Sequence, residues 1–222
     1  MRSIVFIFLS LVACRKPTGD EACIGDANAK HAFVYLHGRE SRTPSSDEEH
    51  NHDVLRRLAK ELDARFAMAR ADTACKDDAS QICWGWAFDD AELEHTAKIA
   101  DAAADKCFAH GTKYALVGFS NGGYAIDDMV ARCQLGKLLP RATRGVTVGA
   151  AMFKGPFFGA PDDLSSCGDL TMIVGTNDQW NFDPTDNYLH ELTKRGAHAR
   201  TVHVPGMAHA LELGPLRDAL RE

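Results

Sequence analysis

The stretch Val117-Gly118-Phe119-Ser120-Asn121-Gly122-Gly123 decides the expected fold. An apolar run, residues 114–117, precedes it, and a run compatible with a helix, residues 124–133, follows it. A strand, a Gly-x-Ser-x-Gly turn and a helix in this order are typical of a nucleophile elbow, in which the chain reverses sharply at the serine. The glycines on either side of the serine lack a Cβ, so strand and helix can approach closely. We therefore expect Ser120 to present its hydroxyl at the carboxyl end of a parallel sheet; the alternative is a glycine-rich turn with a surface serine.

Apolar strand-like runs alternate with helix-like runs along most of the chain. We expect strands over residues 31–36, 65–71, 114–119, 146–150, 170–174 and 199–204, and helices over about 45–63, 89–110, 124–133, 184–195 and 215–222. Such alternation predicts an α/β fold, a doubly wound, mostly parallel sheet with both faces covered. The 222 residues suit one domain with a substantial core.

Composition excludes several classes of protein. Apolar residues make up 45% and charged residues 25% of the chain, which is ordinary for a soluble globular protein. The formal net charge is -6 and no basic stripe is present, so nucleic acid is not an expected partner. The same acidic balance gives no general attraction to anionic lipid.

The amino terminus has the pattern of an export signal. A basic start at Met1-Arg2 is followed by an apolar run, residues 4–12, that is too short to span a bilayer. The ending Leu11-Val12-Ala13-Cys14 resembles the lipobox of bacterial lipoproteins. That resemblance implies cleavage before Cys14 and a lipid on its sulfur, hence a membrane-anchored protein of the periplasm or cell surface. The alternative is an ordinary secretory signal. We expect a signal peptide at 1–13, a flexible tether at 14–30 and the folded domain at 31–222.

Cysteine usage agrees with export. Beyond Cys14 the chain has six further cysteines, and an even set in an exported chain suggests disulfides. The sequence does not choose among the pairings, and only Cys75–Cys83, within one loop, is predicted. A zinc site is the competing interpretation, but no Cys-x-x-Cys pair is present.

Two later loops supply candidate partners for Ser120. A serine hydroxyl needs a base, and the base needs an orienting carboxylate, on loops after later strands in the order serine, acid, histidine. Asp178, directly after the strand at 170–174, is the candidate acid, with Asp183 and Asp186 as rivals. Asp183 is better explained as a helix cap. Among ten histidines only His209 lies in the required loop, between the strand at 199–204 and the last helix.

Further residues complete the predicted site. Backbone N–H groups of Asn121, after the nucleophile, and of Arg39, after His37-Gly38, are the candidate oxyanion donors. Trp86, Phe157 and Trp180 are candidates for an apolar substrate-binding wall; core packing is the alternative for each. Only a short loop, residues 151–169, follows the strand at 146–150, so we expect no helical lid.

A group of acidic and histidine residues at 47–53 raises the question of a metal. His50 and His52 are two apart on an expected helix and point in different directions. We therefore interpret the group as a solvated acidic helix start and expect no metal site.

Taken together, the chain resembles the α/β-hydrolase superfamily. The resemblance rests on Leu36-His37-Gly38, Gly118-Phe119-Ser120-Asn121-Gly122-Gly123, Gly175-Thr176-Asn177-Asp178 and Gly206-Met207-Ala208-His209, and it covers the chain from residue 31 to its end. The segment Trp86-Ala87-Phe88-Asp89 is similar to one in the compact phospholipase/carboxylesterase and acyl-thioesterase group.

The resemblance implies hydrolysis of a small-molecule carboxylic ester through an acyl-enzyme, without a cofactor. Arg39 departs from that group, which often has Leu or Gly after His-Gly. The shape of the oxyanion loop, and with it the substrate, stays open. Peptidase activity on the same residues, or a non-catalytic surface lipoprotein on this fold, are the alternatives.

Overall fold

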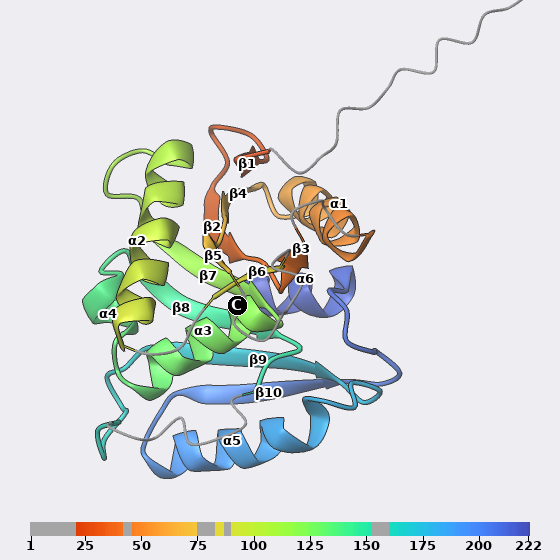
Figure 1. Cartoon of the computed structure of the whole chain (residues 1–222). Coiled ribbons are helices and arrows are strands. Elements are labelled where there is room, and N and C mark those ends of the chain that lie inside the picture. Colours follow the sequence, from red (N-terminus) through yellow and green to blue (C-terminus); the bar gives the residue numbers. More distant parts are fainter. Residues whose placement is uncertain (1–20, 42–45, 75–82, 87–89, 152–159) are drawn as a thin grey trace, which may run out of the picture.

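A seven-stranded sheet forms the centre of the molecule (Figure 1). The computed structural model describes residues 21–41, 46–74, 83–86, 90–151 and 160–222. The strand order is β1-β4-β2-β7-β8-β9-β10, and every neighbouring pair is parallel except β1 with β4. These strands are β1 (Cys23–Ile24), β2 (His31–Leu36), β4 (Ala64–Ala69), β7 (Tyr114–Phe119), β8 (Ala142–Val148), β9 (Asp169–Gly175) and β10 (Ala199–Val204).

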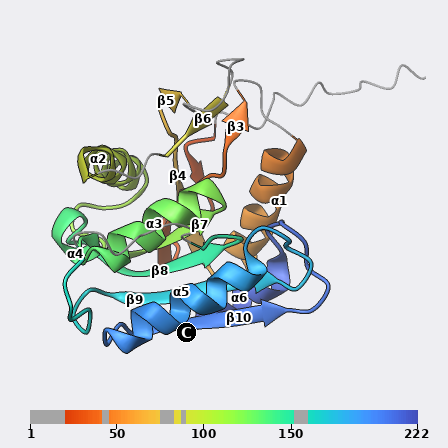
Figure 2. The same cartoon turned by 60° about the horizontal axis from the view of Figure 1, so that its bottom comes forward.

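Helices cover both faces of this sheet, as Figures 1 and 2 show. The helices are α1 (Ser46–Glu61), α2 (Asp90–Cys107), α3 (Asn121–Ala131), α4 (Leu135–Leu138), α5 (Phe182–Lys194) and α6 (Leu213–Arg221). One apolar core lies between the sheet and α2, α3 and α5, and a second lies between the sheet and α1 and α6. The predicted doubly wound, mostly parallel α/β sheet is therefore confirmed.

The central strands are buried on both faces, which explains their sequences. All six residues of β7 are buried, because helices of both layers pack on it. A strand in this position needs a continuous apolar run rather than alternation. That run is the one from which the sequence predicted the strand.

A second, small sheet was not predicted from the sequence. It has the order β3-β6-β5 and is formed by β3 (Glu40–Ser41), β5 (Thr73–Ala74) and β6 (Cys83–Gly85). Each strand has only two or three residues, too few to show a periodic pattern. The sheet joins the loops that follow β2 and β4, so it ties together segments at the carboxyl ends of two neighbouring strands.

The described part of the expected tether belongs to the folded domain. Residues 23–24 form β1, which pairs with β4, and a disulfide joins Cys23 to Cys107 at the end of α2. The prediction of a flexible tether over 14–30 is therefore wrong for residues 21–30, because backbone pairing and a covalent bond hold them. A second disulfide joins Cys133 to Cys167. Cys75–Cys83 and Cys14 lie outside the residues whose side chains are described.

Part of the helix start at 47–53 is buried, which corrects its interpretation as solvated. Glu48, Asn51 and His52 are at most 5% exposed, and His52 Nε2 lies 3.1 Å from Glu48 Oε1. They share the helix face of Leu55 and Leu58, which packs on the sheet. Among the described residues, no group of histidine, cysteine and acidic side chains could hold a metal ion.

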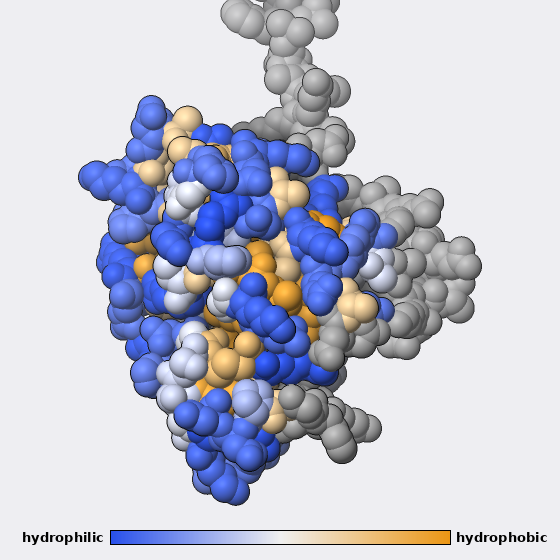
Figure 3. Space-filling model, turned by 90° about the vertical axis from the view of Figure 1, so that its left-hand side faces the viewer, coloured by the Kyte–Doolittle hydropathy of each residue, from blue (hydrophilic) through white to orange (hydrophobic). Residues whose placement is uncertain are grey.

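The molecular surface is largely hydrophilic on the face seen in Figure 3, with an apolar strip across its middle. Within the described residues no helix combines the length and the apolar character needed to cross a bilayer.

A buried carboxylate lies between α3 and the sheet. Asp127 is fully buried, and neither of its carboxylate oxygens has a hydrogen-bond partner among the described residues. Burial raises the pKa of Asp127 to about 8; the nearby Thr147 hydroxyl offsets part of the rise, and the Asp128 carboxylate adds to it. The folded state therefore binds a proton more readily than the unfolded chain.

We expect the change Asp127→Asn to stabilise the protein at neutral and alkaline pH. A group whose pKa is raised on folding contributes stability that is complete below its unfolded pKa and is lost as pH rises through its folded pKa. The free energy of unfolding of the native chain should thus fall between about pH 4 and pH 8. In the variant that loss disappears, so urea unfolding should show a gain of about 5 kcal/mol at pH 8 and little at pH 4. An equal gain at both pH values, or from the exposed control Asp162→Asn, would contradict the assignment.

Candidate active site

Ser120 lies in a strained turn between β7 and α3. Its backbone angles are φ 49° and ψ -116°, a region that non-glycine residues rarely adopt. A Cβ built on Gly122 would lie 2.2 Å from the Leu36 carbonyl oxygen, so only glycine allows α3 to start this close to β2. The predicted strand, sharp turn and helix are all present, and the serine lies at the carboxyl end of β7.

The structure brings the three predicted side chains together in one hydrogen-bonded chain. His209 Nε2 lies 2.9 Å from Ser120 Oγ, and His209 Nδ1 lies 2.8 Å from Asp178 Oδ2. An ionised carboxylate only accepts, so Nδ1 carries the imidazole proton and Nε2 accepts from the serine hydroxyl. Asp178 is buried at 1% exposure, whereas the His209 side chain is 23% exposed. In this arrangement the His209 imidazole can accept the proton of the Ser120 hydroxyl, and solvent can reach the site.

The loops carrying the acid and the base are tied to each other. They follow the neighbouring parallel strands β9 and β10. The Asn177 backbone N–H donates to the Met207 carbonyl at 3.0 Å, the Asn177 amide donates to the Gly206 carbonyl at 3.1 Å, and the Gly206 N–H donates to the Thr176 hydroxyl at 2.8 Å. These bonds fix the separation of Asp178 and His209 through the backbone rather than through the two side chains alone.

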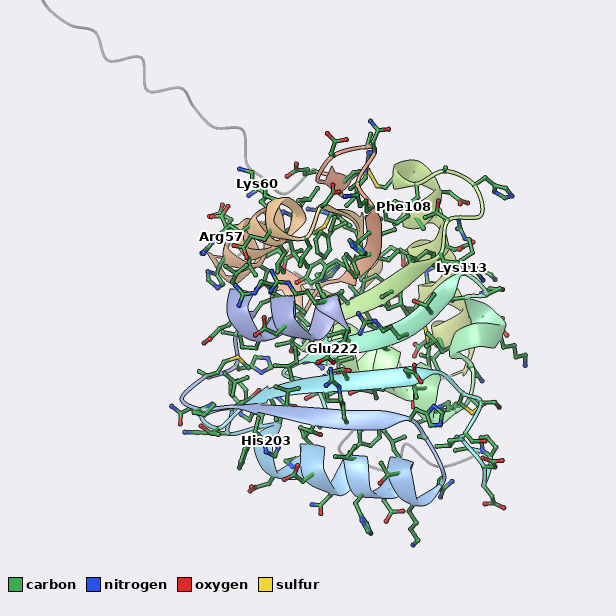
Figure 4. All side chains as sticks on the ribbon, turned by 180° about the vertical axis from the view of Figure 1, so that it is seen from behind. Arg57, Lys60, Phe108, Lys113, His203 and Glu222 are labelled. Atoms are coloured by element: carbon green, nitrogen blue, oxygen red, sulfur yellow. A yellow bond between two sulfur atoms is a disulfide. The ribbon has the colours of Figure 1, made fainter. Side chains whose placement is uncertain are left out.

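The rival acids have other surroundings. The Asp186 carboxylate pairs with His203 Nε2 at 3.0 Å on the side of β10 that faces α5 (Figure 4). Asp183 is exposed in the first turn of α5. It does not cap this helix, because α5 begins at Phe182 and Asn181 occupies the N-cap.

Gly149, at the end of β8, leaves room for the acid and the base. Its φ is 58°, and a Cβ there would lie 2.9 Å from His209 Nδ1 and 3.3 Å from Asp178 Oδ2. A side chain would both strain the backbone and displace the imidazole.

The predicted oxyanion loop lies against the nucleophile. A Cβ built on Gly38 would be 3.4 Å from Ser120 Cβ, which places the segment containing Arg39 beside the serine. Asn121 is the first residue of α3, and its backbone N–H has no partner within the helix. The Asn121 side chain is held by the Trp86 backbone, accepting from its N–H at 2.6 Å and donating to its carbonyl at 3.2 Å. Because its side-chain amide is engaged there, Asn121 can offer its backbone N–H, rather than its amide, to an oxyanion; the Arg39 N–H stays a prediction.

His37 supports this loop from behind. Its Nε2 accepts from the Ala71 N–H at 3.0 Å, so Nδ1 carries the proton and donates to the Gly38 carbonyl at 2.5 Å. Burial lowers the pKa of His37 and keeps the ring neutral, although the Glu48 carboxylate opposes the shift. The Trp86 indole donates to the His37 carbonyl at 2.8 Å.

The three residues predicted to bind substrate differ in position. Trp86 is 4% exposed and packs on the His37 ring, so it lies behind the oxyanion loop. Trp180 is 68% exposed and points its ring edge-on toward His209, with ring centroids 5.4 Å apart. Phe157 lies outside the described residues. Of the three, Trp180 alone is described at the exposed rim of the site, and its role there stays a prediction.

Known proteins resemble this protein in fold but not in sequence. No family model matches the chain, and no curated protein matches it. Solved structures do. Zea mays acyl-protein thioesterase 2 has a TM-score of 0.66 at 13% identity, covering 90% of this chain and 95% of its own. The esterase PE8 has a TM-score of 0.63 at 19% identity, covering 90% and 96%. A carboxylesterase from Mesorhizobium loti has a TM-score of 0.61 at 18% identity, covering 88% and 91%.

The chain has an α/β-hydrolase fold. In this fold, ligands bind outside the carboxyl ends of the strands, and Ser120, Asp178 and His209 all lie on loops at that edge. The similarity in fold and the hydrogen bonds among the three side chains therefore indicate the same region, the edge of the sheet at the carboxyl ends of its strands.

Sequence reasoning missed two polar residues at the site. Asn181 and Tyr124 both hydrogen-bond near Asp178. Tyr124 follows the nucleophile Ser120 by four residues, and Asn181 follows the acid Asp178 by three. The only signal in the sequence was the offset of Asn181, which suits a side chain that folds back on an aspartate at a helix start.

Proposed function

We propose that this protein is an exported serine hydrolase that cleaves carboxylic esters. The observation that supports this best is the continuous chain Ser120–His209–Asp178, with contacts of 2.9 Å and 2.8 Å, on a strained elbow in an α/β-hydrolase fold. A surface serine in a plain turn requires neither a base at its hydroxyl nor a buried carboxylate behind that base.

In the proposed reaction Ser120 Oγ attacks the ester carbonyl carbon while His209 Nε2 takes its proton. Asp178 holds the other imidazole nitrogen and stabilises the imidazolium that forms. The carbonyl oxygen gains negative charge and accepts from the N–H groups of Asn121 and Arg39. The imidazolium then gives its proton to the departing alcohol. Water, deprotonated by the same imidazole, hydrolyses the acyl-enzyme, and Ser120 regains its proton. No step needs a cofactor.

The ester substrate is the finer part of the proposal. The solved structures of similar fold described above are those of an esterase, a carboxylesterase and an acyl-protein thioesterase. Exposed Trp180 beside His209 offers an apolar surface to an acyl chain or alcohol. These features favour esters and thioesters of modest size over peptides.

A fluorophosphonate probe tests the proposed function. We expect stoichiometric labelling at Ser120 in the native protein and none after denaturation, because only an activated serine reacts. A parallel panel of p-nitrophenyl acetate, butyrate and octanoate, an acyl thioester and a peptide substrate should show ester and thioester turnover. Failure of the serine to label would favour the non-catalytic alternative, and faster peptide turnover would favour a peptidase.

Export and anchoring belong to the same proposal. The pattern at residues 1–14 and the disulfides Cys23–Cys107 and Cys133–Cys167 support an oxidising compartment. Mass spectrometry of the protein purified from a bacterial membrane fraction should find an acylated cysteine 14 as the first residue. An unmodified amino terminus would leave an ordinary secretory signal instead.

A further inference from the structure

The hydrogen-bonded chain extends beyond Asp178, through Asn181, to Tyr124 in α3, the helix that begins directly after Ser120. The Tyr124 hydroxyl donates to Asn181 Oδ1 at 2.5 Å. Asn181 Nδ2 lies 3.1 Å from Asp178 Oδ1 and 3.0 Å from Asp178 Oδ2. Tyr124 belongs to the first turn of α3, where its backbone N–H donates to the Ser120 carbonyl at 3.0 Å. The two ends of this hydrogen-bonded chain, Ser120 and Tyr124, therefore lie one helical turn apart.

Burial and several hydrogen bonds hold Asn181 in this position. It is fully buried, its carbonyl accepts from the Thr185 hydroxyl at 2.5 Å, and its backbone N–H also reaches Asp178 Oδ1 at 3.3 Å. Turning its amide over would place the amide oxygen against two carboxylate oxygens, which are all acceptors. In the orientation observed, the amide donates to Asp178, and the Tyr124 hydroxyl adds a bond to its oxygen.

Tyr124 is suited to act as a permanent donor. Burial raises the pKa of Tyr124 to about 12, and the carboxylates of Asp127 and Asp178 add to the rise, while Arg39 opposes it. At neutral pH the hydroxyl keeps its proton and has Asn181 Oδ1 as an acceptor.

The orientation matters because the two oxygens of Asp178 are held differently by the residues that the structure describes. The backbone N–H groups of Trp180 and Asn181 both reach Oδ1, whereas Oδ2 faces His209. The Asn181 amide is thus the one described donor besides the imidazole that reaches Oδ2. It also lies 3.3 Å from His209 Nδ1, close enough to limit rotation of the ring.

We propose that Asn181 and Tyr124 are positioning residues that extend the chain to Ser120–His209–Asp178–Asn181–Tyr124. Asn181 sets the plane of the acid and, through it, the imidazole; Tyr124 acts on the acid through Asn181, whose Oδ1 accepts from its hydroxyl. This inference rests on the proposed function. It predicts an effect on the chemical step rather than on substrate binding, since neither residue is assigned a contact with substrate.

Tyr124→Phe removes the terminal hydroxyl and little else. We expect kcat for p-nitrophenyl butyrate to fall about 10-fold with KM unchanged, because one buried hydrogen bond of the chain is lost. Tyr188→Phe is the matched control: its hydroxyl donates to the Asp127 carbonyl at 2.8 Å, away from the acid, so it should lower the melting temperature and leave kcat unchanged. Equal kcat losses in the two variants would overturn the proposal, as would a change confined to KM.

A double-mutant cycle tests whether Tyr124 acts through Asn181. Asn181→Ala should lower kcat about 100-fold, and adding Tyr124→Phe to it should lower kcat no further. Independent, multiplicative losses would refute the coupling.

An activity-independent measurement separates this inference from the proposed function. The His209 Nδ1–H proton, hydrogen-bonded to a buried carboxylate, should give a downfield NMR resonance in the native protein and in Tyr188→Phe. It should broaden or shift in Tyr124→Phe and Asn181→Ala. If the protein shows this pattern but hydrolyses no ester, only the proposed function is contradicted. If the resonance is unchanged in both variants, the positioning role is contradicted.

Discussion

Replacing Ser120 by alanine should abolish ester hydrolysis while the protein stays folded. The change removes only the hydroxyl that lies 2.9 Å from His209 Nε2. Without it no acyl-enzyme forms, and loss of such a nucleophile typically lowers kcat by about 10⁶-fold. We expect turnover of p-nitrophenyl acetate and butyrate to drop to the background rate and fluorophosphonate labelling to vanish. Steady-state kinetics on purified protein, with circular dichroism and thermal unfolding for the fold, check this result.

Ser166→Ala is the matched control for this experiment. Ser166 is exposed on the loop before β9, and its loss should change neither activity nor labelling. The strained backbone at position 120 predicts a further detail: alanine is no better suited to a φ of 49° than serine, so the melting temperature should stay within a few degrees. Undiminished turnover by Ser120→Ala would end the proposal of a serine nucleophile.

Asp178→Asn should lower kcat by about 10⁴-fold with little change in KM. An asparagine amide placed where Oδ2 accepts from His209 Nδ1 can donate instead, which favours the imidazole tautomer with its proton on Nε2. That tautomer cannot take the proton of Ser120. The pH dependence of kcat/KM is the measurement that identifies this cause, because hydroxide should restore part of the rate at alkaline pH in the variant.

Asp183→Asn and Asp186→Asn provide the comparison for this change. Asp183 is exposed in the first turn of α5, and Asp186 pairs with His203, so neither should alter kcat by more than about 3-fold. A large loss in either of these variants, with Asp178→Asn nearly normal, would show that the acid was wrongly chosen.

The parts of the site that sequence predicted are those with a local signature. The elbow is a contiguous pentapeptide between a strand and a helix, and Asp178 and His209 each follow a strand whose apolar run is visible. Because parallel strands end at one edge, their following loops meet there. Order along the chain was therefore enough to place three side chains that are up to 89 residues apart.

The missed parts depend on contacts that leave no local trace. Cys23 and Cys107 are 84 residues apart, and nothing near either cysteine distinguishes its partner. Asn181 was overlooked because Asp183-Pro184 is a stronger helix-start pattern. In the structure α5 begins at Phe182, directly after Asn181, whose side chain donates to the Asp178 carboxylate. Glu48 and His52 were interpreted as solvated because their polarity hides their position on an otherwise apolar helix face.

The bond between Cys23 and Cys107 has a mechanical consequence. Without the disulfide, a force on the chain just before β1 would separate this two-residue edge strand from β4, breaking one hydrogen bond at a time. With the bond in place, the force passes from residue 23 to the end of α2, which packs mainly on β4 and also on β2. Force applied to the amino-terminal segment would thus act on α2 as well as on β1, and reduction of this one bond would remove that path.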